Sequence, residues 1–228
     1  MFYITKNFIF FLFVIISLTS CGSDRTISSD TTSLSKNATI YEDAEDGTNN
    51  KWEVYQGPYD VKIVNFGAKG SEHSVLLRQN WHKEDGQYVS GVYYRLTNEE
   101  HSNWDNTTQK VLHFDHMKKR SSDGSLYCFT VGVEVDTSYG KRTILFNTYF
   151  DKKHYPPDVT PIEEENTVQI TFPLLTSSVN STKRWQHVSL DIEKYLHKIE
   201  PNNKLIAINA FIVDGGDDYF DNIALDSQ

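Results

Sequence analysis

Alternating apolar and polar residues recur along most of this chain and predict β-strands. The clearest case is Tyr127–Asp136, where every second residue from Tyr127 to Val135 is apolar and most residues between them are polar. Val168–Phe172 repeats this alternation, whereas Ile206–Val213 is apolar on nearly both faces, which is typical of a central strand. The pattern predicts further strands at Asp60–Val64, Ser74–Leu77, Tyr88–Leu96 and Arg142–Phe150.

Two segments depart from this pattern. Leu190–Ile199 predicts a short helix, because Asp191 and Glu193 lie early and Lys198 lies late, as the helix dipole favours. His154–Asn166 contains several prolines and glutamates and predicts a long acidic loop. Many short strands without alternating helices indicate an all-β fold built as an antiparallel two-sheet sandwich.

The first 21 residues follow a different pattern. Lys6 precedes an apolar run, Phe8–Ile16, and small residues follow. The run is shorter than the roughly 20 residues needed to span a bilayer, and this order is typical of a secretory signal. Leu18-Thr19-Ser20-Cys21 resembles a bacterial lipobox, in which the cysteine is diacylated and becomes the first residue of the mature protein.

We therefore predict a signal peptide over residues 1–20 and a fatty-acyl (palmitate-type) membrane anchor on Cys21. Gly22, rather than aspartate, follows the cysteine and favours anchoring in the outer membrane of the cell envelope. The sequence does not indicate whether the protein is on the periplasmic face or on the cell surface. The alternative is an ordinary secreted protein in which Cys21 is incidental. Residues 21–38 are rich in serine, threonine and aspartate and predict a flexible tether, which leaves residues 39–228 as one folded domain.

Charge and cysteine content narrow the classes of partner. The chain has a formal net charge of −9, and −10 once residues 1–20 with their single lysine are removed. An acidic protein repels nucleic acid, so we expect no nucleic-acid partner. With Cys21 lipidated, Cys128 is the only other cysteine and no intramolecular disulfide can form. Its apolar neighbours predict a buried, unreactive thiol.

Several motifs together resemble a known family. They are Tyr41–Gly47 with Trp52–Tyr55, Gly70-Ser71 with Val75–Leu77, Asp136–Arg142, Trp185 with Ser189–Ile192, and Ile208–Gly216 with Phe220–Ile223. In this order they resemble the galactose-binding-like jelly-roll carbohydrate-binding modules that are attached to polysaccharide lyases and glycoside hydrolases. Ser189 stands where the family usually has arginine. The resemblance covers residues 39–228 and implies a jelly-roll sandwich that binds a polysaccharide or oligosaccharide without catalysis.

The resemblance also implies a structural calcium ion between the first and last strands. Asp43 and Glu45 share one face of an extended segment, and Asp221 lies on the closing strand. Calcium takes six to eight oxygen ligands, so converging carboxylates would suit it. We therefore expect Ca²⁺ at Asp43, Glu45 and Asp221. The alternative is that these acids face solvent separately.

Sugar binding needs a flat aromatic ring flanked by planar hydrogen-bonding groups. Residues of these types in predicted strands and loops are Trp81, Tyr93, Arg95, Trp104 and Arg142, which we take as the candidate carbohydrate-binding residues. An exposed arginine could also bind a uronate carboxylate through two parallel hydrogen bonds. The alternative is that the aromatic residues pack in the core or at its rim.

Catalytic motifs are missing from the sequence. It contains no G-x-S-x-G, H-E-x-x-H, P-loop or G-x-G-x-x-G motif. His113 and His116 could suggest a metal pair, but residues three apart on a strand point to opposite faces. Two alternatives to a non-catalytic binding protein stay open: a jelly-roll polysaccharide lyase or glycoside hydrolase, and a structural envelope lipoprotein without a sugar site.

Overall fold

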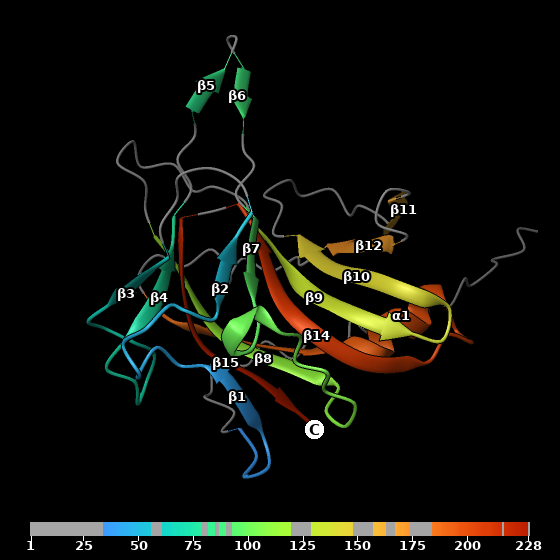
Figure 1. Cartoon of the computed structure of the whole chain (residues 1–228), viewed down its shortest axis with the longest axis horizontal. Helices are drawn as coiled ribbons and strands as arrows, with labels where there is room; N and C mark the ends of the chain where they lie inside the picture. The colour runs from blue at the N-terminus through green and yellow to red at the C-terminus, as the bar shows by residue number, and fades with distance from the viewer. Residues whose placement is uncertain are drawn as a thin grey trace, which may run out of the picture.

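The computed structural model describes residues 34–55, 61–78, 82–84, 87–89, 93–119, 129–147, 157–162, 167–173, 184–215 and 217–227. In these ranges most regular structure is β-strand (Figure 1). The predictions for Cys21, Trp81 and Cys128 concern residues outside these ranges. Within the ranges, no helix is both long and apolar enough to cross a bilayer.

Two sheets make up the domain. The first has the strand order β13-β8-β15-β4-β3, with β1 also paired to β15, and every pairing in it is antiparallel. Its strands are β1 (Thr39–Glu42), β3 (Lys62–Val64), β4 (Ser74–Leu77), β8 (Val111–Lys118), β13 (Gln186–Asp191) and β15 (Asp218–Asp226). We call it the six-stranded sheet.

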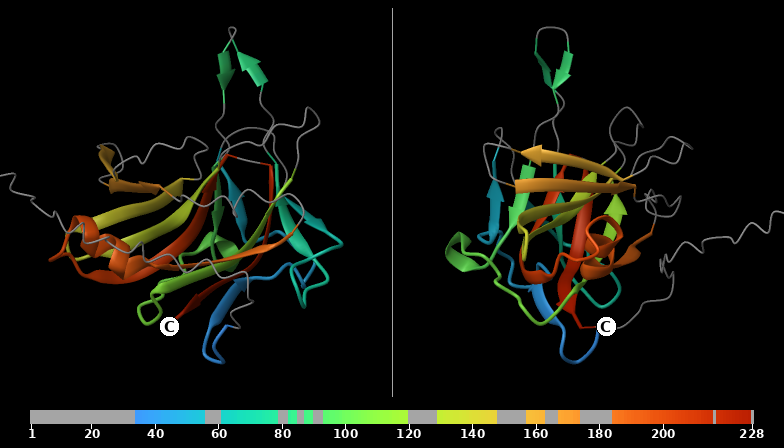
Figure 2. Two further views of the ribbon diagram at one scale, coloured as in Figure 1. Left: turned by 180° about the vertical axis from the view of Figure 1, so that it is seen from behind. Right: turned by 90° about the vertical axis from the view of Figure 1, so that its right-hand side faces the viewer.

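The second, seven-stranded sheet has the order β11-β12-β10-β9-β14-β7-β2. Its only parallel pair among the described strands is β10 with β12. Its strands are β2 (Trp52–Val54), β7 (Tyr93–Leu96), β9 (Thr130–Thr137), β10 (Gly140–Asn147), β11 (Asp158–Ile162), β12 (Thr167–Pro173) and β14 (Leu205–Asp214). A separate hairpin, β5 (His82–Glu84) with β6 (Gln87–Val89), stands away from both sheets (Figures 1 and 2).

Aromatic side chains from both sheets meet in the core. Phe114 and Phe220 come from the six-stranded sheet, and Phe211 comes from the seven-stranded sheet. The Phe211 ring centroid lies 5.5 Å from that of Phe114 and 5.9 Å from that of Phe220. Burying these rings between two sheets is what holds a sandwich together. The predicted all-β jelly-roll sandwich is therefore confirmed.

Some predicted boundaries are wrong. The helix α1 (Ile192–Ile199) begins later than expected, because Asp191 is its N-cap and accepts a hydrogen bond of 2.9 Å from the Lys194 amide. Part of the expected acidic loop is the strand β11. Pro161 is tolerated there because β11 is an edge strand with a single partner, β12.

Strand alternation divides inward from outward side chains. On β7, Tyr94 and Leu96 are buried in the core, so Tyr93 and Arg95 project outward. On β8, the His116 ring lies 4.4 Å from the Phe129 centroid in the interior, and His113 projects from the other face. This confirms that the two histidines point to opposite faces. Each sheet therefore presents an outer face that carries polar side chains.

The chain contacts the domain before β1 begins. The Ser35 amide and hydroxyl donate hydrogen bonds of 2.9 and 2.7 Å to the two carboxylate oxygens of Asp226, near the end of β15. The predicted tether over residues 21–38 thus has its last residues held against the final strand.

Candidate functional site

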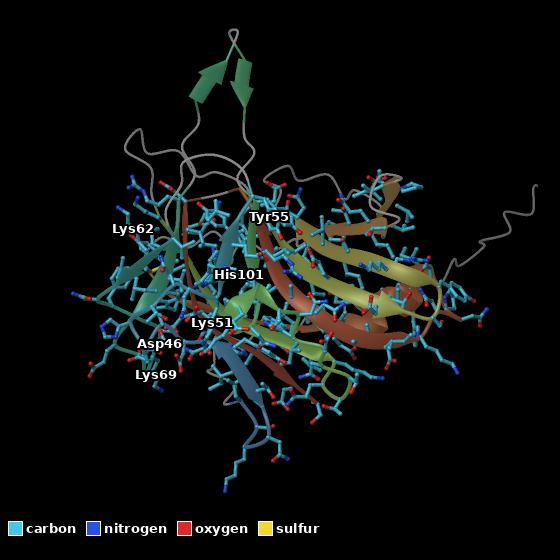
Figure 3. The ribbon with its side chains drawn as sticks, in the orientation of Figure 1. Asp46, Lys51, Tyr55, Lys62, Lys69 and His101 are labelled. Atoms are coloured by element: carbon cyan, nitrogen blue, oxygen red, sulfur yellow. The ribbon has the colours of Figure 1, made fainter. Side chains whose placement is uncertain are left out.

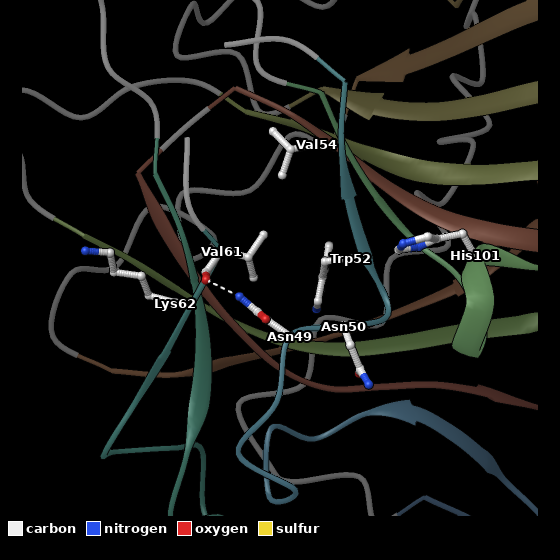
Figure 4. A pocket seen from close by; sticks show the side chains of 7 residues that line it. All are labelled: Asn49, Asn50, Trp52, Val54, Val61, Lys62 and His101. Atoms are coloured by element: carbon white, nitrogen blue, oxygen red, sulfur yellow. Dashed lines mark hydrogen bonds between the residues drawn. The ribbon is translucent and has the colours of Figure 1, made fainter. Parts of the chain in front are cut away.

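The edge strand β2 borders a pocket on its inner side. The pocket has a volume of about 590 Å³ and is lined by Asn49, Asn50, Trp52, Val54, Val61, Lys62 and His101 (Figure 4). It lies where the edge of the seven-stranded sheet faces the chain that leads into β3. The Asn49 side-chain amide bridges the two sides by donating to the Val61 carbonyl at 2.7 Å. The volume of the pocket falls within the range of roughly 300–1,000 Å³ typical of ligand pockets.

Buried hydrogen bonds fix the aromatic wall of this pocket. The Trp52 indole donates to Glu42 Oε2 at 2.8 Å, and the Ala44 amide donates to Oε1 at 2.8 Å. Burial raises the pKa of Glu42, and these two hydrogen bonds partly oppose that rise. Glu42 is buried, and both of its carboxylate oxygens accept hydrogen bonds from protein donors. The hydrogen bond from the indole to Glu42 therefore orients the Trp52 ring on the pocket wall.

His101 borders the pocket opposite Lys62 (Figure 4). It belongs to the short 3-10 segment η1 (Glu99–His101), and Glu100 and His101 have φ angles of +57° and +56°. Side chains other than glycine seldom adopt this left-handed backbone, and such strain is concentrated at functional sites. The strained turn places His101 Nδ1 4.0 Å from Glu53 Oε1, so the histidine joins the pocket to the outer face of β2.

Two tyrosines form an aromatic pair on the outer face of β2 and β7. The ring centroids of Tyr55 and Tyr93 are 5.6 Å apart, with the rings inclined at 73°. Tyr55 is 55% exposed and lies beyond His101 and Lys51 along the same edge (Figure 3). Its hydroxyl donates to Glu53 at 3.2 Å, and the Tyr93 hydroxyl donates to Glu134 at 3.2 Å. Partial burial, followed by the charge of Glu53, raises the pKa of Tyr55.

Arg95 lies between the two glutamates. Its Nε donates to Glu134 at 2.8 Å, its Nη1 to Glu53 at 2.8 Å and its Nη2 to Asn103 Oδ1 at 2.7 Å. Burial alone would lower the pKa of Arg95, but the hydrogen bond to Glu53 and the charge of Glu134 outweigh it and raise that pKa. All three guanidinium nitrogens are thus engaged by protein acceptors, so Arg95 orients its neighbours instead of offering a uronate clamp.

We call the pocket together with Glu53, Tyr55, Tyr93, Arg95 and Glu134 the β2 site. Chemically it offers an exposed tyrosine ring paired with a half-buried one, oriented carboxylate acceptors and an apolar pocket wall rimmed by asparagines. Each glutamate accepts one hydrogen bond from Arg95 and one from a tyrosine hydroxyl. This arrangement suits recognition of a hydroxyl-rich ligand better than proton transfer.

The structure brings together only some of the predicted carbohydrate-binding residues. Tyr93 and Arg95 are both in the β2 site. Trp104 is not, because it is 6% exposed and stacks on Tyr41 with centroids 3.7 Å apart, which leaves no ring face for a sugar. Arg142, which we expected to bind carbohydrate, is not in the β2 site either. It is 7% exposed and its Nε and Nη2 donate to the Glu200 carboxylate at 3.0 Å, as a structural ion pair.

The three acids expected to bind calcium do not form a metal site. Glu45 Oε1 accepts the Glu72 and His73 amides, Asp221 Oδ2 accepts the Ala68 amide, and Asp43 Oδ1 accepts the Glu45 amide. In the described part of the chain, no group of three His, Cys, Asp or Glu side chains could hold a metal ion. Because these oxygens already accept backbone N–H groups, the donor set does not fit calcium.

Sequence reasoning missed Glu53, Tyr55 and Glu134 as members of the site. Alternation along Trp52–Tyr55 places Glu53 and Tyr55 on one face, and the alternation in Tyr127–Asp136 places Glu134 outward. These signals were in the sequence. What it lacked was the strand order β9-β14-β7-β2, which brings Glu134 beside Arg95 across an intervening strand.

Comparisons with known proteins follow. No protein-family model and no curated protein matches the sequence. Similar solved structures include a carbohydrate-binding module of the β-sandwich superfamily, with 11% identity, a TM-score of 0.42, and 84% of this chain covered. This chain spans 62% of that structure's length.

Two further structures are similar at the same level. The K3 adhesin domain of Lys-gingipain from Porphyromonas gingivalis has 10% identity and a TM-score of 0.41, with 82% of this chain and 98% of that one covered. The C-terminal family 22 carbohydrate-binding module of Clostridium thermocellum Xyn10B has 11% identity and a TM-score of 0.39, with 84% and 94% covered. At these scores, the function of this chain has to be argued from its own residues.

Proposed function

We propose that this chain is a lipid-anchored, non-catalytic carbohydrate-binding protein of the bacterial cell envelope, and that the β2 site holds a polysaccharide or oligosaccharide. The observation that carries the proposal is the exposed ring of Tyr55 packed against the half-buried Tyr93, set beside the Arg95–Glu53–Glu134 network. Aromatic rings provide the apolar area against which sugar C–H groups pack. Carboxylates fixed by Arg95 provide acceptors for sugar hydroxyls without a large ordering cost on binding.

The charge of the Arg95–Glu53–Glu134 network favours a neutral glycan. Arg95 is the one cation in its contact with Glu53 and Glu134, so the three side chains together carry a net negative charge. A uronate would bring another carboxylate towards two acids and find the guanidinium already engaged. The acidic chain as a whole adds to this repulsion.

The anchoring part of the proposal rests on residues 1–21. Cys21→Ser should leave the folded domain intact and release the protein from the membrane fraction, because the acylated sulfur would be gone. Intact-mass measurement of the membrane-extracted protein should show the acyl groups on the wild type alone. Wild-type protein without added acyl mass would contradict the anchor.

A glycan array tests the binding proposal. Residues 34–228 would be screened as the wild type, as the double variant Tyr55→Ala/Tyr93→Ala and as Tyr139→Ala. Tyr139 is a matched control because it is 56% exposed in the turn between β9 and β10. We expect neutral glycans to bind the wild type and the control, and binding to fall about tenfold or more in the double variant, as for an aromatic hot spot.

The same screen separates the two alternatives. The burial of Trp104 supports a structural lipoprotein without a sugar site, and that alternative predicts no binding by any variant. The lyase or hydrolase alternative predicts shortened glycan products, which chromatography of the incubated glycans would detect.

A further inference from the structure

The outer face of the six-stranded sheet contains a pair of histidines that the β2 site does not use. His113 lies on β8 and His187 on the edge strand β13, and the two imidazole rings stack with centroids 5.4 Å apart at 28°. Their facing nitrogens, His113 Nδ1 and His187 Nε2, are separated by 3.2 Å. Strand register produces this contact, because His187 pairs with Asp115, two residues along β8 from His113.

A carboxylate fixes the chemical state of the second ring. Asp115 Oδ1 lies 3.0 Å from His187 Nδ1. A carboxylate only accepts, so His187 Nδ1 carries the proton. The lone pair of a neutral His187 is then on Nε2, directed at His113. Hydrogen bonding of the second imidazole nitrogen to a carboxylate is the usual support for a metal-binding histidine.

A bulge in β15 holds that carboxylate in turn. The register between β8 and β15 shifts between Asp221 and Ala224, and Asn222 has a φ of +50°. This backbone aims the Asn222 side-chain amide at Asp115 Oδ2, to which it donates at 2.8 Å. Bulges often re-aim a side chain at a functional site, and here the strained residue orients the group that orients His187.

Charge around the pair favours a cation. Asp115 contacts His187 on one side, and Asp226 lies close enough to His113 for the two to interact electrostatically. His113 is 4% exposed, and the His187 side chain is 10% exposed at the edge of the sheet. His187, at the β13 edge of the sheet, is therefore the more accessible of the two rings.

We propose that His113 Nδ1 and His187 Nε2 bind one divalent transition-metal ion of the imidazole-preferring class, Cu²⁺, Ni²⁺ or Zn²⁺. His113 changes tautomer, so that its proton moves from Nδ1 to Nε2 and both facing nitrogens present lone pairs. Two protein ligands leave the remaining positions to water, so this site binds more weakly than one with four protein ligands. It stands on the opposite sheet from the β2 site and does not depend on sugar binding.

Copper binding by the purified protein tests this proposal. Cu²⁺ is the strongest-binding probe of the class, and its electron paramagnetic resonance spectrum reports bound nitrogens. We expect one equivalent of Cu²⁺ with a two-nitrogen spectrum in the wild type. Either His113→Gln or His187→Gln should remove that spectrum. Asp115→Asn should keep both ligands and weaken binding about 10–100-fold, as loss of a supporting carboxylate does.

His73→Gln is the matched control, because His73 Nδ1 lies 3.4 Å from Glu45 without a second imidazole in that contact. It should bind Cu²⁺ as the wild type does. Circular dichroism checks that each variant is folded, and Asp115→Asn keeps the test valid if a histidine variant does not fold. The proposal is overturned if the wild type shows no two-nitrogen signal. It is equally overturned if the folded variants of His113, His187 and Asp115 all bind Cu²⁺ as the wild type does, because the copper would then be bound elsewhere.

Discussion

The outer faces of the two sheets both carry aromatic and polar side chains, but these side chains differ in how exposed they are. On the seven-stranded sheet, Tyr55 is exposed and packs against the half-buried Tyr93, and the glutamates beside them are held by Arg95. On the six-stranded sheet, His113 and His187 are largely shielded, and their polar atoms face each other. The first face offers area and oriented acceptors to a large ligand. The second offers directed lone pairs to a small one.

The type of a residue does not by itself decide its role in this protein. Tyr55 and Trp104 are both aromatic, yet Tyr55 is exposed and Trp104 is stacked beneath the surface on Tyr41. Arg95 and Arg142 both bind glutamate, but Arg95 lies beside a pair of packed tyrosine rings, whereas Arg142 donates to the backbone carbonyl of Tyr139. Accessibility and neighbours distinguish a ligand-binding residue from a packing residue.

The largest effect should come from the buried aromatic residue. Trp104→Ala removes a stacked indole from the core and should lower the free energy of unfolding by about 3–5 kcal/mol. Urea unfolding measures the loss. Sugar binding by the fraction that remains folded should be unchanged. A stable Trp104→Ala variant with lost sugar binding would reverse the assignment of Trp104 and Tyr55.

The next effect concerns Asp221, which pairs with Asp115 between β15 and β8. Burial raises the pKa of Asp221 to about 7, although hydrogen bonds from the Ala68 and Asn222 amides oppose the rise. Since the folded pKa is above the ordinary value of 3.8, this group's stabilising effect is complete below about pH 4 and is lost as the pH rises through about 7. Relative to Asp221→Asn, the wild type should lose about 3 kcal/mol over that range.

Urea unfolding of both proteins at several pH values between 4 and 8 measures this difference. Asp115, across the sheet, contributes to the same rise in the pKa of Asp221 and must be kept intact in both proteins. A constant difference between wild type and variant over the range would show that Asp221 ionises normally.

A smaller effect, about tenfold in affinity, should follow from changing the charge of the β2 site. Glu53→Gln/Glu134→Gln leaves Arg95 without its two anionic partners. The positive charge of the guanidinium is then no longer neutralised, so binding of uronate-containing oligosaccharides should strengthen by about 1.4 kcal/mol. Isothermal titration with a neutral and an acidic oligosaccharide measures the change. If uronate affinity stays the same, the network does not exclude acidic glycans.

The smallest effect should come from chelation. Because Asp43, Glu45 and Asp221 already accept backbone amides, EDTA should leave the melting temperature unchanged. Differential scanning calorimetry with EDTA and with added Ca²⁺ measures this. A rise in melting temperature that depends on Ca²⁺ would show a folded-state calcium site and contradict the fit described above.

Local pattern and long-range pairing explain what could be predicted from the sequence. The apolar pattern located Ser74–Leu77, which is buried throughout, and alternation located most of the long strands, because side-chain period reports which face is buried. Tyr93 and Arg95 were identified because they share a face in that pattern. The prediction of a loop across β11 was wrong, since Pro161 is compatible with an edge strand and the sequence does not show which strand is at the edge.

The remaining members of both sites depend on contacts between distant strands. Glu134 joins Arg95 across β14, and His187 joins His113 across the pairing of β13 with β8. His113 was compared only with His116, its neighbour along the chain. The strand opposite, whose register no local pattern specifies, supplies the actual partner.

Isothermal titration with the best-binding neutral oligosaccharide can separate the contribution of Tyr55 from that of any exposed tyrosine. Tyr55→Ala and Tyr139→Ala remove the same side chain from positions of nearly equal exposure, 55% and 56%. We predict that Tyr55→Ala weakens binding about tenfold or more while Tyr139→Ala binds as the wild type does. Equal affinity in all three proteins would contradict a sugar site at the Tyr55–Tyr93 pair.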